Sequence, residues 1–295
     1  MATPPPAYTN SNSYSNHGFD RTNSLSSRHS ISHQPNRQSS TDRGLGGLMV
    51  GLGAAAMLNN AMNNQSAQTN QYQGNGNGRE DPLTTLGRFD TILLIDDSAS
   101  MAMGDLWKEA AGAVSGLAET LVKYDSDGIE VYFMSSSEYL LNARSAQSIN
   151  ELFQRVRPVG TSTPTDVRVE ELLGLYMNRL EANKAQNMPP LKPVNLIVIT
   201  DGEADDPDTL AYALAGFAER LDMGRFPLTQ VGVQFIQIGK DRAATKALKE
   251  LDDELKNTYG VKRDIVDTTP YKGRLTADFI MKAVLGGINK RIDRG

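Results

Sequence analysis

Short apolar runs alternate with segments of helical periodicity from residue 89 onward, and this alternation restricts the chain to one class of fold. Several runs are continuous in Val, Ile and Leu, which is typical of parallel strands covered on both faces. The pattern predicts an α/β fold with a doubly wound, mostly parallel central sheet flanked by helices. The expected strands are 89–95, 129–135, 194–200, 231–238 and 263–266, and the expected helices are 105–123, 148–155, 166–181, 207–221, 242–258 and 275–292.

The first 85 residues differ in composition from the rest of the chain. Ser, Asn, Gln, Gly, Pro and Thr dominate there, so this part cannot bury enough apolar surface to offset the entropy of ordering it. We therefore expect a disordered tail over residues 1–85 and one globular domain over residues 88–292. Residues 44–58 (GLGGLMVGLGAAAML) form an apolar segment of the tail that is shorter than the roughly 20 residues of a membrane span. Self-association and transient membrane contact are the alternatives to an unstructured insert.

Oxygen-bearing side chains gather directly after two of the expected strands. Asp96, Ser98 and Ser100 alternate in IDDSAS, and Asp201 follows the strand that ends in VIT. A third loop, GTSTPTD at 160–166, runs into a helix and supplies further hydroxyls. Since ligands of such sheets lie outside the carboxyl ends of the strands, we expect the three loops to meet at one edge. Carboxylate and hydroxyl oxygens without nitrogen or sulfur favour Mg²⁺, Mn²⁺ or Ca²⁺.

The segment ILLIDDSASM (92–101) is similar to motifs of two known families. One is the response-regulator receiver domain, in which paired acids hold Mg²⁺ beside a phospho-accepting Asp. Ser135, Ser136 and Ser137 stand where that acceptor is required, although Lys240 could supply the expected lysine. The missing acceptor removes the chemistry of a receiver, so we do not favour this reading.

The chain resembles more fully the von Willebrand factor A domain with a metal-ion-dependent adhesion site. That site combines a D-x-S-x-S loop, a distant Thr and an Asp after a central strand, and the sequence has all three in this order, within about residues 88–292. Ala99 departs from the many members that have Gly there. The resemblance implies that Mg²⁺ (or Mn²⁺ or Ca²⁺) binds at the site and takes an Asp or Glu of a partner protein. The implied ligands are Asp96, Ser98, Ser100, Thr163 (with Thr161 as the alternative) and Asp201.

Other acidic residues beside these motifs have simpler explanations. Asp97 is expected to face solvent or to pair with a basic residue rather than to bind the ion. Glu203 is expected to be an exposed turn residue. Three further aspartates are expected to cap or charge the start of the following helix, namely Asp205, Asp206 and Asp208.

Composition excludes several function classes. The net charge of −5 gives no reason to expect nucleic-acid binding. The absence of Cys is compatible with a reducing compartment, and the N-terminus lacks the features of a secretory signal, so we expect an intracellular, cytoplasmic protein. We expect no enzyme, because no Walker-type phosphate loop occurs and the three His (His17, His29, His33) all lie in the tail.

These features predict a divalent-metal-dependent protein–protein interaction module. One alternative is a tail-driven scaffold or self-assembly protein in which the domain is passive, and a further one is Mg²⁺-dependent phosphoryl transfer. The last predicted helix contains Gly286 and Gly287, which we expect to weaken it midway, because each Gly costs up to about 1 kcal/mol in a helix.

Overall fold

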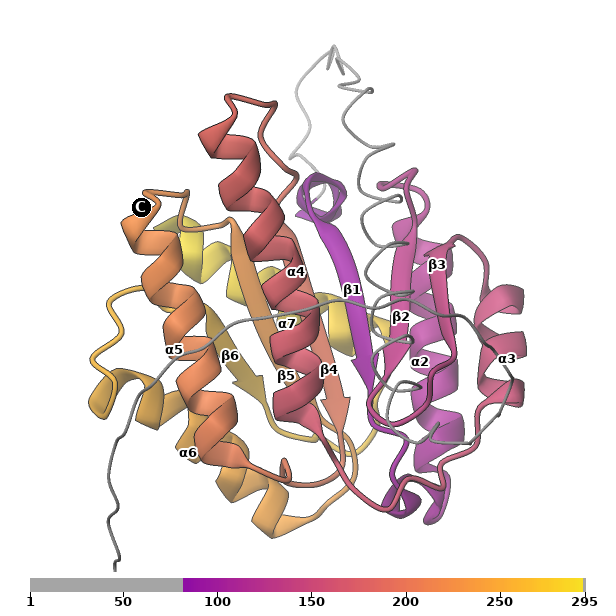
Figure 1. Ribbon diagram of the computed structural model, residues 1–295. Helices are drawn as coiled ribbons and strands as arrows, with labels where there is room; N and C mark the ends of the chain where they lie inside the picture. Colours follow the sequence, from indigo (N-terminus) through magenta and orange to yellow (C-terminus); the bar gives the residue numbers. More distant parts are fainter. Residues whose placement is uncertain (1–81, 294–295) are drawn as a thin grey trace, which may run out of the picture. The chain divides into compact units, whose positions relative to one another are not determined.

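The computed structural model describes residues 82–293, and its centre is a six-stranded sheet of order β3-β2-β1-β4-β5-β6 (Figure 1). All neighbouring strands are parallel except β3, which pairs with β2 in the antiparallel direction. This arrangement confirms the predicted doubly wound, mostly parallel sheet. The strands are β1 (Asp90–Ile95), β2 (Ile129–Phe133), β3 (Tyr139–Ala143), β4 (Val194–Thr200), β5 (Val231–Gln237) and β6 (Val266–Thr269).

The central strands form because their residues are suited to burial on both faces of a pleated sheet. Every residue of β4 (VNLIVIT) and β5 (VGVQFIQ) is buried, and so are five of the six residues of β1. Ile95 of β1 pairs in register with Ile199 of β4, and the amide of Asp96 continues this ladder to the Ile199 carbonyl at 2.9 Å. The register therefore brings the carboxyl ends of β1 and β4 to one edge of the sheet.

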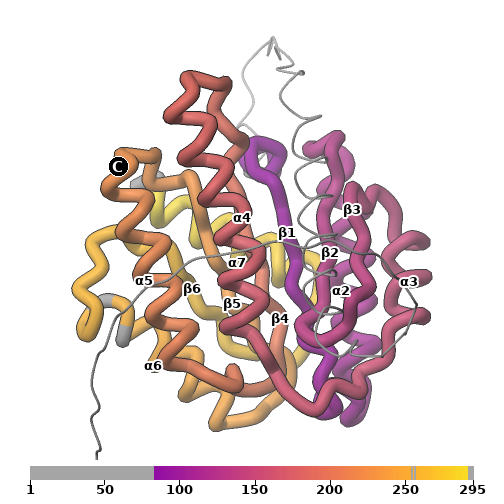
Figure 2. Tube along the Cα trace, viewed as in Figure 1, coloured from indigo at the N-terminus to yellow at the C-terminus, as the bar shows by residue number. Residues whose placement is uncertain are grey.

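Helices cover the two faces of the sheet (Figures 1 and 2). One apolar core lies between the sheet and α4, α5 and α6, and the other lies between the sheet and α2, α3 and α7. The helices are α2 (Leu106–Leu121), α3 (Ala146–Arg155), α4 (Thr165–Ala185), α5 (Pro207–Met223), α6 (Arg242–Asn257) and α7 (Ala277–Asp293), with two 3₁₀ helices, η2 (Pro82–Arg88) and η3 (Ala99–Ala102).

The structured part includes residues that the composition assigned to the tail. Helix η2 begins at Pro82, and Leu83 and Leu86 pack against the core formed with α2, α3 and α7. The rest of the predicted tail, with the apolar segment 44–58, lies outside the described residues.

Two edge strands differ from the prediction. The sequence pattern did not indicate β3, because its residues YLLNA are only partly buried and Asn142 has a left-handed φ of 53°. Strand β6 lies at Val266–Thr269 rather than at 263–266. Three of the four residues of its sequence VDTT are polar and two are only partly buried, so it lacks the continuous apolar run that is typical of the inner strands.

The glycine pair near the C-terminus does not interrupt its helix, and the expected cost of the pair to helix stability stays a prediction. Helix α7 runs without a break from Ala277 to Asp293. A Cβ on Gly287 would lie 2.5 Å from Asp267 Oδ2 on β6, whereas a Cβ on Gly286 would meet nothing within 4 Å. Gly287 therefore allows α7 to approach the sheet closely, which offsets its low helix propensity.

Candidate metal site

Three loops meet at the carboxyl edge of the sheet, and hydrogen bonds join them in pairs. The loop after β1 and the loop before α4 exchange backbone bonds: the Ala99 amide donates to the Gly160 carbonyl at 2.8 Å, and the Gly160 amide donates to the Asp97 carbonyl at 3.0 Å. A Cβ on Gly160 would lie 3.1 Å from the Asp97 carbonyl oxygen and 2.8 Å from Ser135 Oγ, so glycine favours this close approach. The structure thus brings together the three segments that the sequence pattern placed at one edge.

Asp96 is the buried centre of this arrangement, with no exposed surface. Its Oδ1 accepts a hydrogen bond from the Ser98 amide at 2.8 Å, and its Oδ2 accepts one from Thr200 Oγ1 at 2.7 Å. Both carboxylate oxygens are therefore held in fixed directions. Sequence reasoning missed Thr200, whose only signal is a hydroxyl on the last residue of a central strand.

Ser98, Ser100 and Asp201 form a chain of side-chain hydrogen bonds. Ser100 Oγ donates to Asp201 Oδ1 at 2.8 Å, and Ser98 Oγ lies 2.9 Å from Ser100 Oγ. Because the single hydroxyl hydrogen of Ser100 goes to Asp201, Ser98 is the donor in the second bond. Burial raises the pKa of Asp201; the bond from Ser100 opposes this rise, and the Asp96 carboxylate adds to it.

Thr163 lies in the third loop and is tied to the loop after β4 through its backbone. Its amide donates to Asp205 Oδ1 at 2.8 Å, and the Asp205 amide donates to the Thr163 carbonyl at 3.0 Å. Thr163 is half-buried, whereas Thr161 is exposed. Asp205 thus joins two loops instead of capping a helix, while Asp206 does cap α5, since its Oδ1 accepts the Thr209 amide at 2.9 Å.

Asp97 does not face solvent and pairs with no basic residue of the described range 82–293, so that expectation is wrong. It is only 2% exposed, and its two carboxylate oxygens accept the amides of Ser135 and Ser136 at 2.7 and 2.8 Å. Burial raises the pKa of Asp97 against the opposing effect of these bonds. Asp97 therefore anchors the loop after β2 to the loop after β1.

The donor set of this edge fits a hard divalent cation. Asp96 and Asp201 supply carboxylate oxygens, and Ser98 and Ser100 supply hydroxyls, which are the oxygen ligands that Mg²⁺, Mn²⁺ and Ca²⁺ take; Thr163 would add a third hydroxyl. Within residues 82–293, no three acidic, His or Cys side chains gather as they would around a metal ion. Any ion here would therefore depend on hydroxyl ligands beside two carboxylates.

A family model described as the von Willebrand factor type A domain matches residues 90–264, which is more than half of the chain. The chain belongs to this family. The matched range contains all five residues of the candidate site and ends before β6 and α7. No curated protein matches the chain.

Three solved structures illustrate the similarity of this von Willebrand factor type A domain to known folds. Proximal thread matrix protein 1 from the mussel byssus is 19% identical, with a TM-score of 0.41, 69% of this chain covered and 48% of that one. Manganese-loaded TRAP protein of Plasmodium vivax is 13% identical (TM-score 0.35; 68% and 74% covered). The pilus adhesin SpaC of Lactobacillus rhamnosus GG is 16% identical (TM-score 0.39; 70% and 30% covered). The chain thus spans about half of the mussel protein and under a third of SpaC.

None of the helices within residues 82–293 has both the length and the apolar character needed to cross a bilayer.

Proposed function

We propose that this domain is a divalent-metal-dependent protein-interaction module. Asp96, Ser98, Ser100, Thr163 and Asp201 would hold Mg²⁺, Mn²⁺ or Ca²⁺, and the ion would bind an Asp or Glu of a partner protein in an open coordination position. The observation that carries the proposal is the hydrogen-bond chain Ser98–Ser100–Asp201, which joins the ends of two central strands and gathers hard oxygen ligands there.

The charge around the site supports dependence on a cation. Glu203, Asp205 and Asp241 are exposed beside the two carboxylates of the site, and Asp241 contributes to the raised pKa of Asp201. Without a cation this edge would repel an acidic partner. A divalent ion would offset the charge of Asp96 and Asp201, and it would make binding of a further carboxylate sensitive to geometry.

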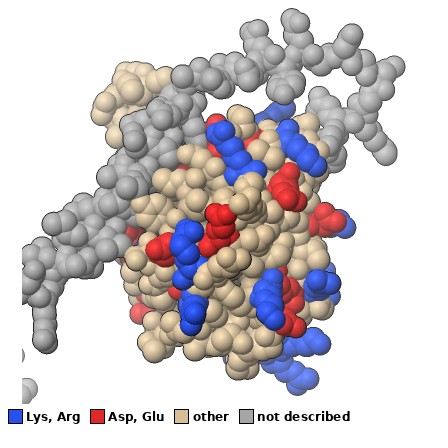
Figure 3. Space-filling model, turned by 90° about the vertical axis from the view of Figure 1, so that its right-hand side faces the viewer, with Lys and Arg blue, Asp and Glu red and all other residues tan. Residues whose placement is uncertain are grey.

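A non-enzymatic role fits the side chains at this edge. No His occurs in residues 82–293, and Glu203 is an exposed loop residue. The face drawn in Figure 3 shows basic and acidic side chains interspersed, unlike the basic stripe typical of nucleic-acid binding. An intracellular, cytoplasmic location stays a prediction from the sequence.

Mn²⁺ titration of the full chain, followed by the electron paramagnetic resonance of the free ion, tests the ligand set. We expect one Mn²⁺ site in the wild type and at least tenfold weaker Mn²⁺ binding in Asp201→Asn. Loss of a residue that only orients a metal ligand already weakens metal binding by about tenfold or more. Asp208→Asn removes the same charge from an exposed position of α5 and is the matched control. Equal Mn²⁺ affinity in all three proteins would contradict the proposal.

A tail-driven scaffold is the second candidate, and the apolar segment 44–58 motivates it. Deleting residues 1–81 separates the two, because the cut leaves η2 and its contacts with the core intact. The interaction-module proposal predicts unchanged Mn²⁺ binding in the truncated chain. If light scattering shows that the full chain assembles and the truncated chain does not, the scaffold function is supported instead.

A further inference from the structure

Three large apolar side chains are exposed in the segments that form the candidate metal site. Met103 is 68% exposed, Val159 71% and Val167 57%. Met103 follows the candidate ligand Ser100 by three positions, and the two valines lie four positions before and after Thr163. Single exposed apolar residues are common on protein surfaces, but their concentration at one polar site marks an interaction surface. Within residues 82–293, the other large apolar side chains that are exposed lie after α4 or on α5, namely Met188, Tyr212 and Met223.

Met103 and Val159 belong to the same half of the site, formed by the loop after β1 and the loop before α4. These are the two loops that the backbone bonds of Gly160 join. Met103 stands one 3₁₀ turn beyond Ser100, because its amide donates to the Ser100 carbonyl at 2.8 Å. Val159 directly precedes Gly160. In Figure 1 both loops lie at the end of the sheet to which the arrow of β1 points.

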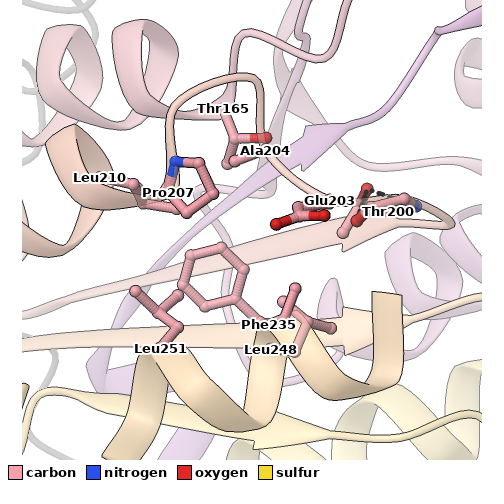
Figure 4. Close-up of a pocket in the computed structure, with 11 residues that line it drawn as sticks. Thr165, Thr200, Glu203, Ala204, Pro207, Leu210, Phe235, Leu248 and Leu251 are labelled. Carbon is pink, nitrogen blue, oxygen red and sulfur yellow. Dashed lines mark hydrogen bonds between the residues drawn. The ribbon is translucent and has the colours of Figure 1, made fainter. Parts of the chain in front are cut away.

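The other half of the site, formed by the loops after β4 and β5, differs in character. Among the described residues, these two loops carry no exposed large apolar side chain. A pocket opens beside the turn after β4 (Figure 4), but its large apolar lining residues are buried, as Phe235, Leu248 and Leu251 are 1%, 8% and 6% exposed. The apolar surface that a partner can reach is therefore confined to the half that contains Met103 and Val159.

We propose that Met103 and Val159 bind an apolar side chain of the partner segment whose acidic residue is held at the metal site. This inference rests on the proposed function, and it specifies the partner further. Three residues of 3₁₀ helix rise about 6 Å, and an extended segment spans about 3.4 Å per residue. The partner segment thus carries its apolar residue within about three positions of the acidic one.

The chemistry of the two side chains favours an apolar residue over a polar or charged one. A polar side chain placed on them would lose its water without gaining strong hydrogen bonds, which is unfavourable. An apolar side chain would remove from water both its own surface and that of Met103 and Val159. Because the Met103 side chain is unbranched and flexible, it adapts to apolar groups of different shapes. We therefore expect a preference for apolar residues as a class.

Peptide display tests the inference with defined probes. A random peptide library with one fixed Asp, and a second library with Asn at that place, are selected on the full chain in Mg²⁺ and in chelator. On the wild type we expect apolar residues to be enriched within three positions of the fixed Asp. The double variant Met103→Ser/Val159→Ser should lose this enrichment and bind the best peptide about tenfold more weakly.

Two further double variants separate the surface from general effects of substitution. Met103→Lys/Val159→Lys should select acidic residues where the wild type selects apolar ones, a change of preference that loss of the fold cannot produce. Met188→Ser/Met223→Ser replaces two apolar residues that are 54% and 71% exposed but lie outside the loops of the site, and it should select as the wild type does.

The selections distinguish failure of this inference from failure of the proposed function. If Asp is preferred over Asn only in Mg²⁺, but the apolar enrichment is missing or persists in Met103→Ser/Val159→Ser, the inference is overturned and the proposed function stands. If the enrichment depends on these two residues but the Asp and Asn libraries behave alike, the apolar surface is supported and metal-dependent capture is contradicted. Absence of both preferences would overturn both. A dimer of the full chain that the same variant abolishes in sedimentation would assign the surface to a second copy and overturn the inference.

Discussion

Glu130 is a buried carboxyl group whose ionisation should make the stability of the domain depend on pH. It lies on β2, is 8% exposed, and accepts a hydrogen bond from the Tyr132 hydroxyl at 3.0 Å. Burial raises its pKa from 4.5 to about 7; the Tyr132 bond opposes the rise, and the nearby Asp90 carboxylate adds to it. Glu130 is distant from the candidate metal ligands along β2, at the opposite end of the sheet from the site loops.

The sign follows from proton binding in the two states. Between pH 4.5 and 7 the folded chain keeps a proton on Glu130 that the unfolded chain has lost, so the free energy of unfolding falls as the pH rises through this window. The two pKa values differ by about 2.5, which corresponds to roughly 3 kcal/mol in total. Part of the loss has already occurred at pH 5, which leaves about 2–3 kcal/mol between pH 5 and pH 8.

Glu130→Gln keeps the shape of the side chain and an acceptor for the Tyr132 hydroxyl, but it cannot ionise. Urea unfolding of both proteins at pH 5, 6.5 and 8, in chelator, should show the variant gaining about 2–3 kcal/mol over the wild type from the lowest to the highest pH. Glu119→Gln, on the exposed side of α2, controls for the change in net charge. A stability difference that is the same at all three pH values would refute the argument from burial.

Four other substitutions have outcomes that follow from local contacts. Gly286→Ala should stabilise the domain by about 0.5–1 kcal/mol, whereas Gly287→Ala should destabilise it by about 1–3 kcal/mol. The two differ because only a Cβ on Gly287 would meet a carboxylate oxygen of β6. Equal shifts of the two variants in thermal unfolding would contradict this. Thr200→Val should lower the free energy of unfolding by about 1–3 kcal/mol and weaken Mn²⁺ binding, since it removes the donor to Asp96 Oδ2. An unchanged Mn²⁺ titration would show that this hydrogen bond does not orient the Asp96 carboxylate for the ion. Asp97→Asn should lower the free energy of unfolding in urea by about 2–3 kcal/mol, because an NH₂ group replaces an oxygen that accepts a hydrogen bond from a backbone amide. An unchanged free energy of unfolding would contradict the anchoring role of Asp97.

The inner part of the fold could be predicted because burial on both faces leaves a direct mark on the sequence. Strand β4 lies at the predicted residues 194–200, where every side chain is buried. The edge strand β3 carries no such mark, since most of its residues are only partly buried and Asn142 interrupts its extended backbone. Its pairing depends on β2 being beside it, and no local pattern records that.

In the candidate site, the sequence likewise identified several of the polar side chains but not all of the contacts that position them. The alternation in IDDSAS and the Asp that follows VIT identified side chains that the structure does bring together, namely Ser98, Ser100 and Asp201. The role of Asp97 could not be found in this way, because its partners are backbone amides 38 and 39 residues further along the chain. In the sequence, Ser135 and Ser136 were notable only because they stand where a receiver domain has its phospho-accepting Asp. In the structure, their backbone amides hold the carboxylate of Asp97.

The hydrogen bonds that hold the loops together also leave ligand capacity for an ion. Ser100 gives its one hydroxyl hydrogen to Asp201, and Ser98 gives its own to Ser100, so the lone pairs of the Ser98 oxygen remain available to a cation, and one lone pair of Ser100 does. Asp96 is oriented by Ser98 and Thr200 through bonds that need no ion. The cost of ordering these oxygens is therefore met when the domain folds, and not when an ion arrives. Under the proposed function, a cation would therefore bind and leave without refolding of the domain, which is what reversible capture of an acidic partner would require.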